Sequence, residues 1–239
     1  MAKFSTTKTS ERQLATQLRK VARVVGSIID VHTDDSGIII DPEALDAALL
    51  AYSDALGPWA ESVTAKILNS IAASNQRAWN SAAVDLSEEL RRTLNTTSVG
   101  STALQLQNEQ VALIKSLPIE AGEKAQIISQ QSATGGIRAN EAAKRILNLG
   151  NITENRAVLI ARTETAKSNA AFTQARASSI GSTHYTWVTA GDADVRETHA
   201  ELDGKIFAFA NPPFIEGEGF HGPGNIWNCR CFADPIIPN

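Results

Sequence analysis

Apolar residues recur every three or four positions through most of the first 180 residues, which is the spacing that lines one face of an α-helix. Residues 10–30 show this pattern clearly, and Ser10 is a candidate N-cap. Residues 42–56 follow Asp41, a favourable N-cap, and begin with Pro42, which suits the first helical turn. We expect an amphipathic helix over each segment.

Further helices are predicted from the same spacing and from the glycine and proline residues between segments. Proline cannot donate a hydrogen bond inside a helix, so one helix is expected to stop before Pro118. Thr153 is expected to open the last helix. The predicted segments are residues 58–94, 103–117, 120–133, 138–149 and 153–180.

Beyond the last predicted helix the pattern changes to short runs of aromatic and β-branched residues, which favour strands. Strands are predicted within residues 184–191, 204–210 and 229–237, with a short helical or irregular turn at 193–202. Residues 211–225 are rich in proline and glycine and predict a long loop with no element of its own. The last part of the chain is therefore expected to be a small sheet.

These elements predict a mostly α protein with a small α+β C-terminal module. An elongated helical body of several helices is expected in residues 1–150. The second part, residues 151–239, is expected to contain the long helix 153–180 and a compact three-strand α+β cap at 183–239. So small a cap needs either an internal staple or firm packing against the helices.

Composition narrows the class of protein. A formal net charge of −4 and 43% hydrophobic residues suit a globular protein and disfavour a dedicated nucleic-acid binder. The part from Thr183 onward carries eight acidic residues against three basic ones. No stretch reaches the ~18–20 apolar residues of a membrane span, and the first residues lack the apolar core of a secretory signal. Two cysteines are too few for a disulfide framework, so we expect a reducing compartment and no secretion.

The two cysteines of the chain, Cys229 and Cys231, lie close together near its end. A disulfide between them is disfavoured, because such residues on a strand are about 6.6 Å apart, whereas a disulfide needs its Cβ atoms ~3.8 Å apart. Zinc prefers thiolates and imidazoles, and a closed structural site needs four ligands. Cys229, Cys231, His199 and His221 are therefore candidate ligands of a structural zinc ion. Alternatively, the cysteines are small buried apolar residues and the histidines bond within loops.

Catalytic motifs are matched less well. His199 and Glu201, followed by a cysteine pair, are similar to the zinc deaminases, in which a histidine and two cysteines hold the metal and a glutamate moves protons. That signature requires Pro-Cys-x-x-Cys at the start of a helix, whereas the pair here is Cys-x-Cys after Asn228. A deaminase is therefore not expected, and neither a glycine-rich phosphate loop nor a Ser-His-Asp arrangement stands out.

Several short motifs follow one another from the last predicted helix onward: "ARTETAKSNAA" on the helix, "GDADVRETH" and "LDGKIF" after the first strand, and "GPGNIWNCRC" near the end. In this order they resemble the phage Mu F-like minor head proteins, also called the phage head morphogenesis family. The resemblance covers residues 153–235. The matching residues are Arg162, Thr163, Glu164, Asn169, Trp187, Asp192, Arg196, His199, Asp203, Gly204, Asn228, Cys229, Arg230 and Cys231.

The resemblance implies a structural protein of a tailed bacteriophage rather than an enzyme. It implies a minor head protein, in several copies inside the head and associated with the portal protein, that acts in head morphogenesis, DNA packaging or DNA ejection. Further expected partners are the major capsid or scaffold protein and packaged DNA. Assembly in the host cytoplasm without a membrane and residence in the virion interior are expected. Two alternatives stay open: a zinc-dependent hydrolase or nuclease effector packaged with the phage, and an assembly adaptor or scaffold absent from the mature particle.

The helix that carries the first motif also offers a surface for the terminal cap. Arg162 and Asn169 are seven residues apart and therefore lie on one helix face. We expect the cap to pack against this face, with Arg162 and Glu164 paired to groups such as Asp192 or Arg196. The alternative is that these charges are simply solvated.

Overall fold

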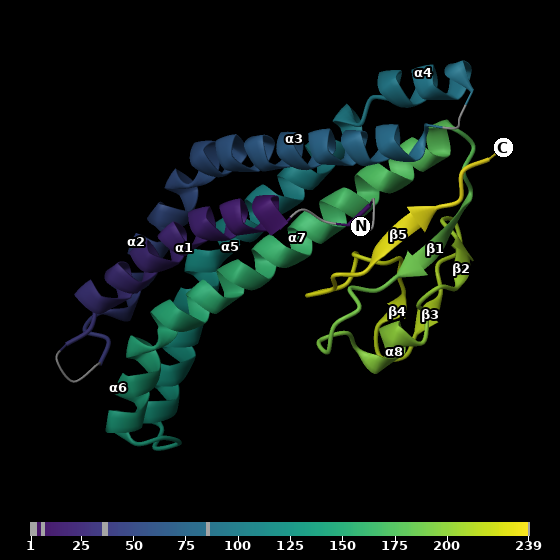
Figure 1. Cartoon of the computed structure of the whole chain (residues 1–239). Coiled ribbons are helices and arrows are strands. Elements are labelled where there is room, and N and C mark those ends of the chain that lie inside the picture. The colour runs from purple at the N-terminus through teal and green to yellow at the C-terminus, as the bar shows by residue number, and fades with distance from the viewer. Residues whose placement is uncertain (1–3, 6–7, 35–37, 85–86, 239) are drawn as a thin grey trace. The chain divides into compact units, whose positions relative to one another are not determined.

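The computed structural model describes residues 4–5, 8–34, 38–84 and 87–238. Helices occupy the chain up to residue 179 and strands follow them (Figure 1). The helices are α1 (Lys8–Val31), α2 (Pro42–Ala55), α3 (Gly57–Ala82), α4 (Glu88–Thr96), α5 (Gly100–Ala133), α6 (Ala139–Leu147) and α7 (Leu149–Ser179). The predicted fold class, mostly helical with a small C-terminal α+β module, is confirmed.

Local capping chemistry sets the start of α2 but not that of α1. The carboxylate of Asp41 accepts hydrogen bonds from the backbone N–H groups of Glu43 and Ala44, each at 3.0 Å. These bonds satisfy two of the four free N–H groups at the helix start. Ser10 is not a cap, because α1 begins at Lys8 and the Ser10 side chain is buried inside the helix.

The predicted stop at Pro118 is wrong, because α5 continues through this residue. A proline inside a helix costs about 3 kcal/mol. The residues around it are deeply buried, with Ile114, Leu117 and Ala121 between 1% and 2% exposed. Burial of one isoleucine or leucine side chain stabilises a protein by ~1.5–3 kcal/mol. Packing therefore outweighs the hydrogen bond that the proline removes.

Two further helix boundaries differ from those predicted. The segment expected as one helix is divided into α3 and α4, and Ser87 caps α4 by accepting a hydrogen bond from Leu90 N at 3.3 Å. Helix α7 begins at Leu149, before the predicted Thr153. The hydroxyl of Thr153 donates to the Leu149 carbonyl at 2.8 Å, as a threonine inside a helix does.

The terminal module contains a three-stranded antiparallel sheet in the order β2-β1-β5. On the central strand, Tyr185 and Trp187 are buried and alternate with more exposed residues, so one face of the sheet carries the core of the module. The elements of the module are β1 (His184–Val188), α8 (Glu197–Ala200), β2 (Ile206–Ala208), β3 (Phe214–Ile215), β4 (Gly219–Phe220) and β5 (Phe232–Pro235).

The segment 211–225, predicted to hold no element, contains a small hairpin. Phe214 pairs with Phe220, and Ile215 pairs with Gly219. Gly217 and Gly219 have φ values of +78° and +90°, a conformation that glycine adopts without strain. The prediction failed because two-residue strands are too short to produce a detectable alternation of apolar and polar residues.

Two compact units divide the chain. The first comprises Met1–Arg12, Ala65–Gln107 and Arg162–Asn239, and the second comprises Gln13–Thr64 and Asn108–Ala161. The terminal sheet and the part of α7 that bears the family motifs lie in the first unit. The domain boundary expected at residue 150 stays a prediction. Within the described residues, no helix combines the length and apolar character needed to cross a membrane.

The first unit contains two clusters of buried side chains. In one cluster Phe4 packs edge-on against Trp79, with ring centroids 4.9 Å apart. The other fills the terminal module and includes both cysteines among aromatic and aliphatic residues. Its members are Tyr185, Trp187, Ile215, Cys229, Cys231 and Ala233. The cysteines are therefore part of the core of the module.

Candidate metal centre

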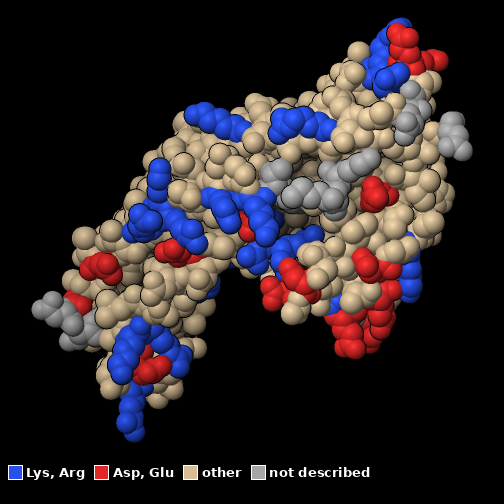
Figure 2. Space-filling view, in the orientation of Figure 1, with Lys and Arg blue, Asp and Glu red and all other residues tan. Residues whose placement is uncertain are grey.

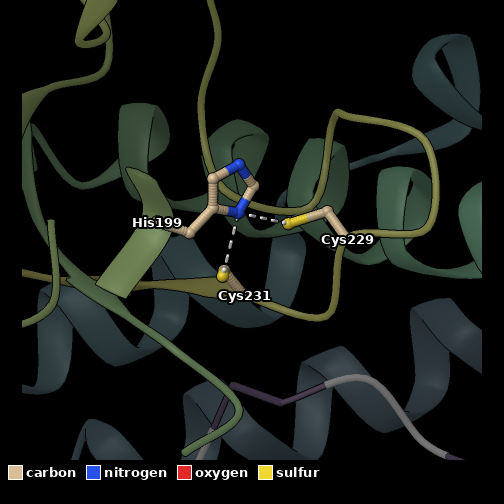
Figure 3. Close-up of side chains that lie close together, drawn as sticks. All are labelled: His199, Cys229 and Cys231. Atoms are coloured by element: carbon tan, nitrogen blue, oxygen red, sulfur yellow. Dashed lines mark hydrogen bonds between the residues drawn. The ribbon is translucent and has the colours of Figure 1, made fainter. Parts of the chain in front are cut away.

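Three side chains that bind soft metal ions meet inside the terminal module (Figure 3). The Nδ1 atom of His199 lies 3.6 Å from the Sγ atom of Cys229 and 3.6 Å from that of Cys231. The exposed fractions of these residues are 2%, 2% and 4%. In the described part of the chain, no other group of three His, Cys, Asp or Glu side chains comes close enough to share a metal ion.

The backbone before β5 brings both sulfur atoms to the same place. Asn228 has a φ of +60°, a conformation that asparagine tolerates better than most residues. Gly224 has a φ of +86°, and a Cβ atom there would lie 3.3 Å from the carbonyl oxygens of Ala166 and Cys231. Glycine therefore allows this segment to approach α7 closely while it turns the thiols towards His199.

The orientation of the imidazole is set from its other side. Nε2 of His199 lies 2.9 Å from Oε2 of Glu218, next to the β3–β4 turn. A carboxylate only accepts hydrogen bonds, so Nε2 donates to Glu218, and Nδ1 faces the two sulfur atoms. The indole of Trp187 packs edge-on against the imidazole, with ring centroids 5.5 Å apart.

The two thiols differ in acidity because they share a hydrogen bond. This bond lowers the pKa of Cys229 to about 6, and backbone N–H groups of Gly224 and Cys231 add to the effect, whereas burial opposes it. The same bond raises the pKa of Cys231, and burial and the negative charge of Cys229 raise it further. The shared hydrogen bond therefore favours the thiolate form of Cys229 over that of Cys231.

His221, the fourth predicted ligand, does not join this group. The hairpin holds it elsewhere: its backbone N–H donates to the Pro213 carbonyl at 3.3 Å, and its side chain lines a separate cavity with Tyr185 and Phe209. Glu218, which was not predicted as a site residue, is the side chain that contacts the second ring nitrogen of His199. A single glutamate in a glycine-rich loop carries no sequence signal of such a role. Both cysteines are free thiols in the structure.

The family motif on α7 contacts the terminal module directly. Nη1 of Arg162 donates to Oδ1 of Asn228 at 2.7 Å, and its Nε donates to Oε1 of Glu11 at 3.2 Å. The backbone N–H of Asn228 donates to the hydroxyl of Thr163 at 3.0 Å. Asn228 therefore joins the segment that carries the cysteines to two successive residues of α7.

The other charged motif residues make pairs within the module, in place of the predicted pairing of Arg162 with Asp192 or Arg196. Arg230 donates to both carboxylate oxygens of Asp192, at 2.5 and 2.7 Å. This contact lowers the pKa of Asp192. Arg196 donates to the Trp227 carbonyl at 2.7 Å. The partner of Asp192 is Arg230, the residue between the two cysteines, and the 38 positions that separate the pair along the chain hide this contact from the sequence.

The remaining motif residues support turns and the packing of α7. Asp203 accepts a hydrogen bond from Thr189 N at 2.7 Å, and Gly204 next to it has a φ of +75°. Asn169, 6% exposed, donates to the Phe4 carbonyl at 2.7 Å. Glu164 is also buried on α7. Asn169 and Asp203 therefore bond to other parts of the protein.

One buried cation of α7 was not singled out from the sequence. Arg176 is 3% exposed, donates to Oδ1 of Asn75 at 2.6 Å and to Oε1 of Gln76 at 2.9 Å, and burial lowers its pKa. Asn75 also donates to Asn169 and to Thr173. A polar network therefore joins α3 to α7 inside the first unit. The sequence gives one indication that Arg176 is buried: it lies on the same face of α7 as apolar buried residues.

Comparison with known proteins agrees with the motifs. Residues 125–233, from α5 to β5, match the family described as Phage Mu protein F like protein. An uncharacterized protein of Haemophilus influenzae (strain ATCC 51907 / DSM 11121 / KW20 / Rd) is 41% identical over 160 residues, which make up 67% of this chain and 34% of the relative. The chain thus spans about a third of the length of that relative. No solved structure matches this chain. The family that residues 125–233 match is thus the one that the motifs of the last third of the chain resemble.

Proposed function

We propose that this protein is a phage head morphogenesis protein, and that it is a minor structural component inside the head, bound to the portal protein. The family match over residues 125–233 carries this proposal. In this role the protein occupies the interior of the virion in several copies and is assembled in the host cytoplasm. It acts in head assembly, DNA packaging or DNA ejection by holding other components in place rather than by turning over a substrate.

The contacts of the family motif support an architectural role. Arg162 and Thr163 each bond to Asn228, and Asp192 bonds to Arg230. Catalytic residues need free polar groups that face a substrate, whereas these groups are occupied by contacts within the protein. The motif is therefore best understood as the set of contacts that fixes the terminal module to α7.

Charge favours a protein partner over DNA for the terminal module. From Thr183 onward the chain has eight acidic and three basic residues, and the face in Figure 2 shows acidic side chains gathered on this module. A phosphate backbone is bound by clusters of lysine and arginine. The proposed contacts with portal, capsid or scaffold proteins fit this distribution better than direct binding of packaged DNA.

Mass spectrometry of purified, DNA-filled particles tests the proposal. The protein should be present at a small, constant ratio to the major capsid protein, and a tagged copy should co-purify with the portal protein. Presence only in empty precursor particles or in the host lysate would instead identify an assembly adaptor or scaffold. Absence from all particle fractions contradicts a role in the head.

A zinc-dependent hydrolase is the second candidate, and one observation favours it. Three protein ligands with an open fourth position are typical of catalytic zinc, and a cavity of about 50 Å³ lies beside the His199, Cys229 and Cys231 group. Chelation separates the two roles. A catalytic metal is removed with loss of nuclease or hydrolase turnover and little loss of stability, whereas a structural metal is removed with loss of the fold of the module.

A further inference from the structure

We propose that His199, Cys229 and Cys231 bind one zinc ion, through the imidazole Nδ1 and two thiolates, with a water molecule in the fourth position. The ion has three protein ligands and excludes His221. Three protein ligands and a water are more typical of a catalytic than of a structural zinc site, but the ligands of this ion come from separate segments of the terminal module, so we assign it the role of holding the module together. This assignment rests on the geometry of the module and is independent of the proposed place in the phage head.

The distances match those of a tetrahedral zinc site. Zinc binds histidine nitrogen at ~2.0–2.1 Å and thiolate sulfur at ~2.3 Å, and tetrahedral angles then place nitrogen and sulfur about 3.6 Å apart. Both Nδ1 to Sγ distances are 3.6 Å. The three ligand atoms lie within 4.8 Å of one another, as the ligands of a single ion do. No side chain has to move far for an ion to enter.

The surroundings supply what such an ion needs beyond its ligands. Zinc-bound histidines usually donate their second N–H to a carboxylate, which fixes the ring and raises its basicity. Glu218 makes this contact with His199 at 2.9 Å. Backbone N–H groups of Gly224 and Cys231 point at the sulfur of Cys229 and stabilise its negative charge. Hydrogen-bond partners of the kind that surround a bound zinc ion are therefore present around both His199 and Cys229.

Position in the fold gives the ion a structural role. His199 comes from α8, its partner Glu218 comes from the β3–β4 turn, and the cysteines immediately precede β5. One ion would tie these three segments into one unit. Strands β2, β3 and β4 contain only two or three residues each, so the module has little backbone pairing of its own. Small modules of this kind are commonly stabilised by a metal ion.

The chemistry of the ligands selects the ion. Two thiolates and an imidazole are soft and intermediate donors, which prefer zinc over magnesium or calcium. The alternative is that the two buried thiols stay metal-free as small apolar core residues. That alternative predicts no stoichiometric metal, no change on chelation, and tolerance of Cys-to-Ser exchange at about the cost of any small core substitution.

Metal content of the full-length chain, purified without an affinity tag or chelator, is the first test. We expect one zinc ion per chain by plasma mass spectrometry. The apoprotein should bind one Co²⁺ with the intense visible bands of a tetrahedral site and a thiolate charge-transfer band. X-ray absorption of the zinc-loaded protein should show two sulfur ligands at ~2.3 Å and two nitrogen or oxygen ligands at ~2.0–2.2 Å, the imidazole and the water.

Variants identify the ligands. His199→Gln and Cys231→Ser should lose stoichiometric zinc, and Glu218→Gln should bind it ~10–100-fold more weakly. His221→Gln is the matched control and should keep full metal content. The assignment is overturned if the wild-type chain binds no zinc, if its absorption spectrum lacks sulfur ligands, or if His221→Gln loses as much metal as His199→Gln. The absorption spectrum needs no variant, so poor folding of a variant leaves that test intact.

Discussion

Replacement of Arg162 by alanine tests whether the family motif fixes the terminal module to α7. The side chain makes one charged hydrogen bond to Asn228 at 2.7 Å and one ion pair with Glu11 at 3.2 Å. A hydrogen bond to a charged group contributes ~1.5–3 kcal/mol when buried. Arg162 is 36% exposed, so the lower end of that range applies, and its partly exposed ion pair adds ~0.2–1 kcal/mol. We expect a loss of about 2 kcal/mol in the free energy of unfolding.

Thermal unfolding followed by tryptophan fluorescence measures this loss. The signal includes the unfolding of the terminal module, because Trp187 and Trp227 lie in it. For a chain of this size, 1 kcal/mol corresponds to ~2–4 °C, so Arg162→Ala should lower the Tm by roughly 4–8 °C. Arg92→Ala is the matched control. Arg92 also pairs with a glutamate on a helix, but the two side chains are 74% and 85% exposed, and the expected loss is only a few tenths of a kcal/mol.

A double-mutant cycle with Asn228→Gly identifies the partner. Glycine keeps the positive φ of this position and removes only the side chain. The two substitutions should be less than additive by about 1 kcal/mol, because each one already removes the same hydrogen bond. A Tm shift below about 1 °C for Arg162→Ala, or full additivity in the cycle, would refute the role of this contact.

Three further outcomes follow from single positions. Gly224→Ala should destabilise the protein by ~2 kcal/mol or more in chemical unfolding, because the position has a positive φ and two carbonyl oxygens lie beside it. Gly135→Ala is the control. This position has a similar φ but open space around it, so the substitution should cost only ~1 kcal/mol. Arg176→Ala should cost ~2–4 kcal/mol in the same assay, because it leaves the buried Asn75 amide without its donor. Asp192 has a lowered pKa in the folded state, so its contribution to stability is present above the unfolded value and is lost as the pH falls through the folded one. Asp192→Asn should therefore lower the free energy of unfolding at neutral pH. The variant should also lose less of this free energy than the wild type as the pH falls below ~4, measured by chemical unfolding as a function of pH.

Sequence periodicity located the helical part of the chain because a helix is a local structure. The Asp41 cap and the strand around Tyr185 depend on residues within a few positions of each other, and both agree with the structure. The Pro118 prediction failed for the opposite reason. A local rule states the cost of a proline in a helix, but the burial of Ile114 and Leu117 that compensates for it arises only once the chain has folded.

The candidate site divides in the same way. Sequence alone determined that the two cysteines lie close together near a histidine-containing segment. It also determined that the last third of the chain carries motifs that resemble those of a phage head family, because such motifs consist only of residue types and their order. Only the tertiary structure decided that His199 meets both cysteines, that His221 does not, and that Glu218 orients the imidazole. These contacts join residues 19 to 32 positions apart. Their distances depend on how a short helix and a two-strand hairpin fold back towards the chain end, and local spacing holds no information about that path.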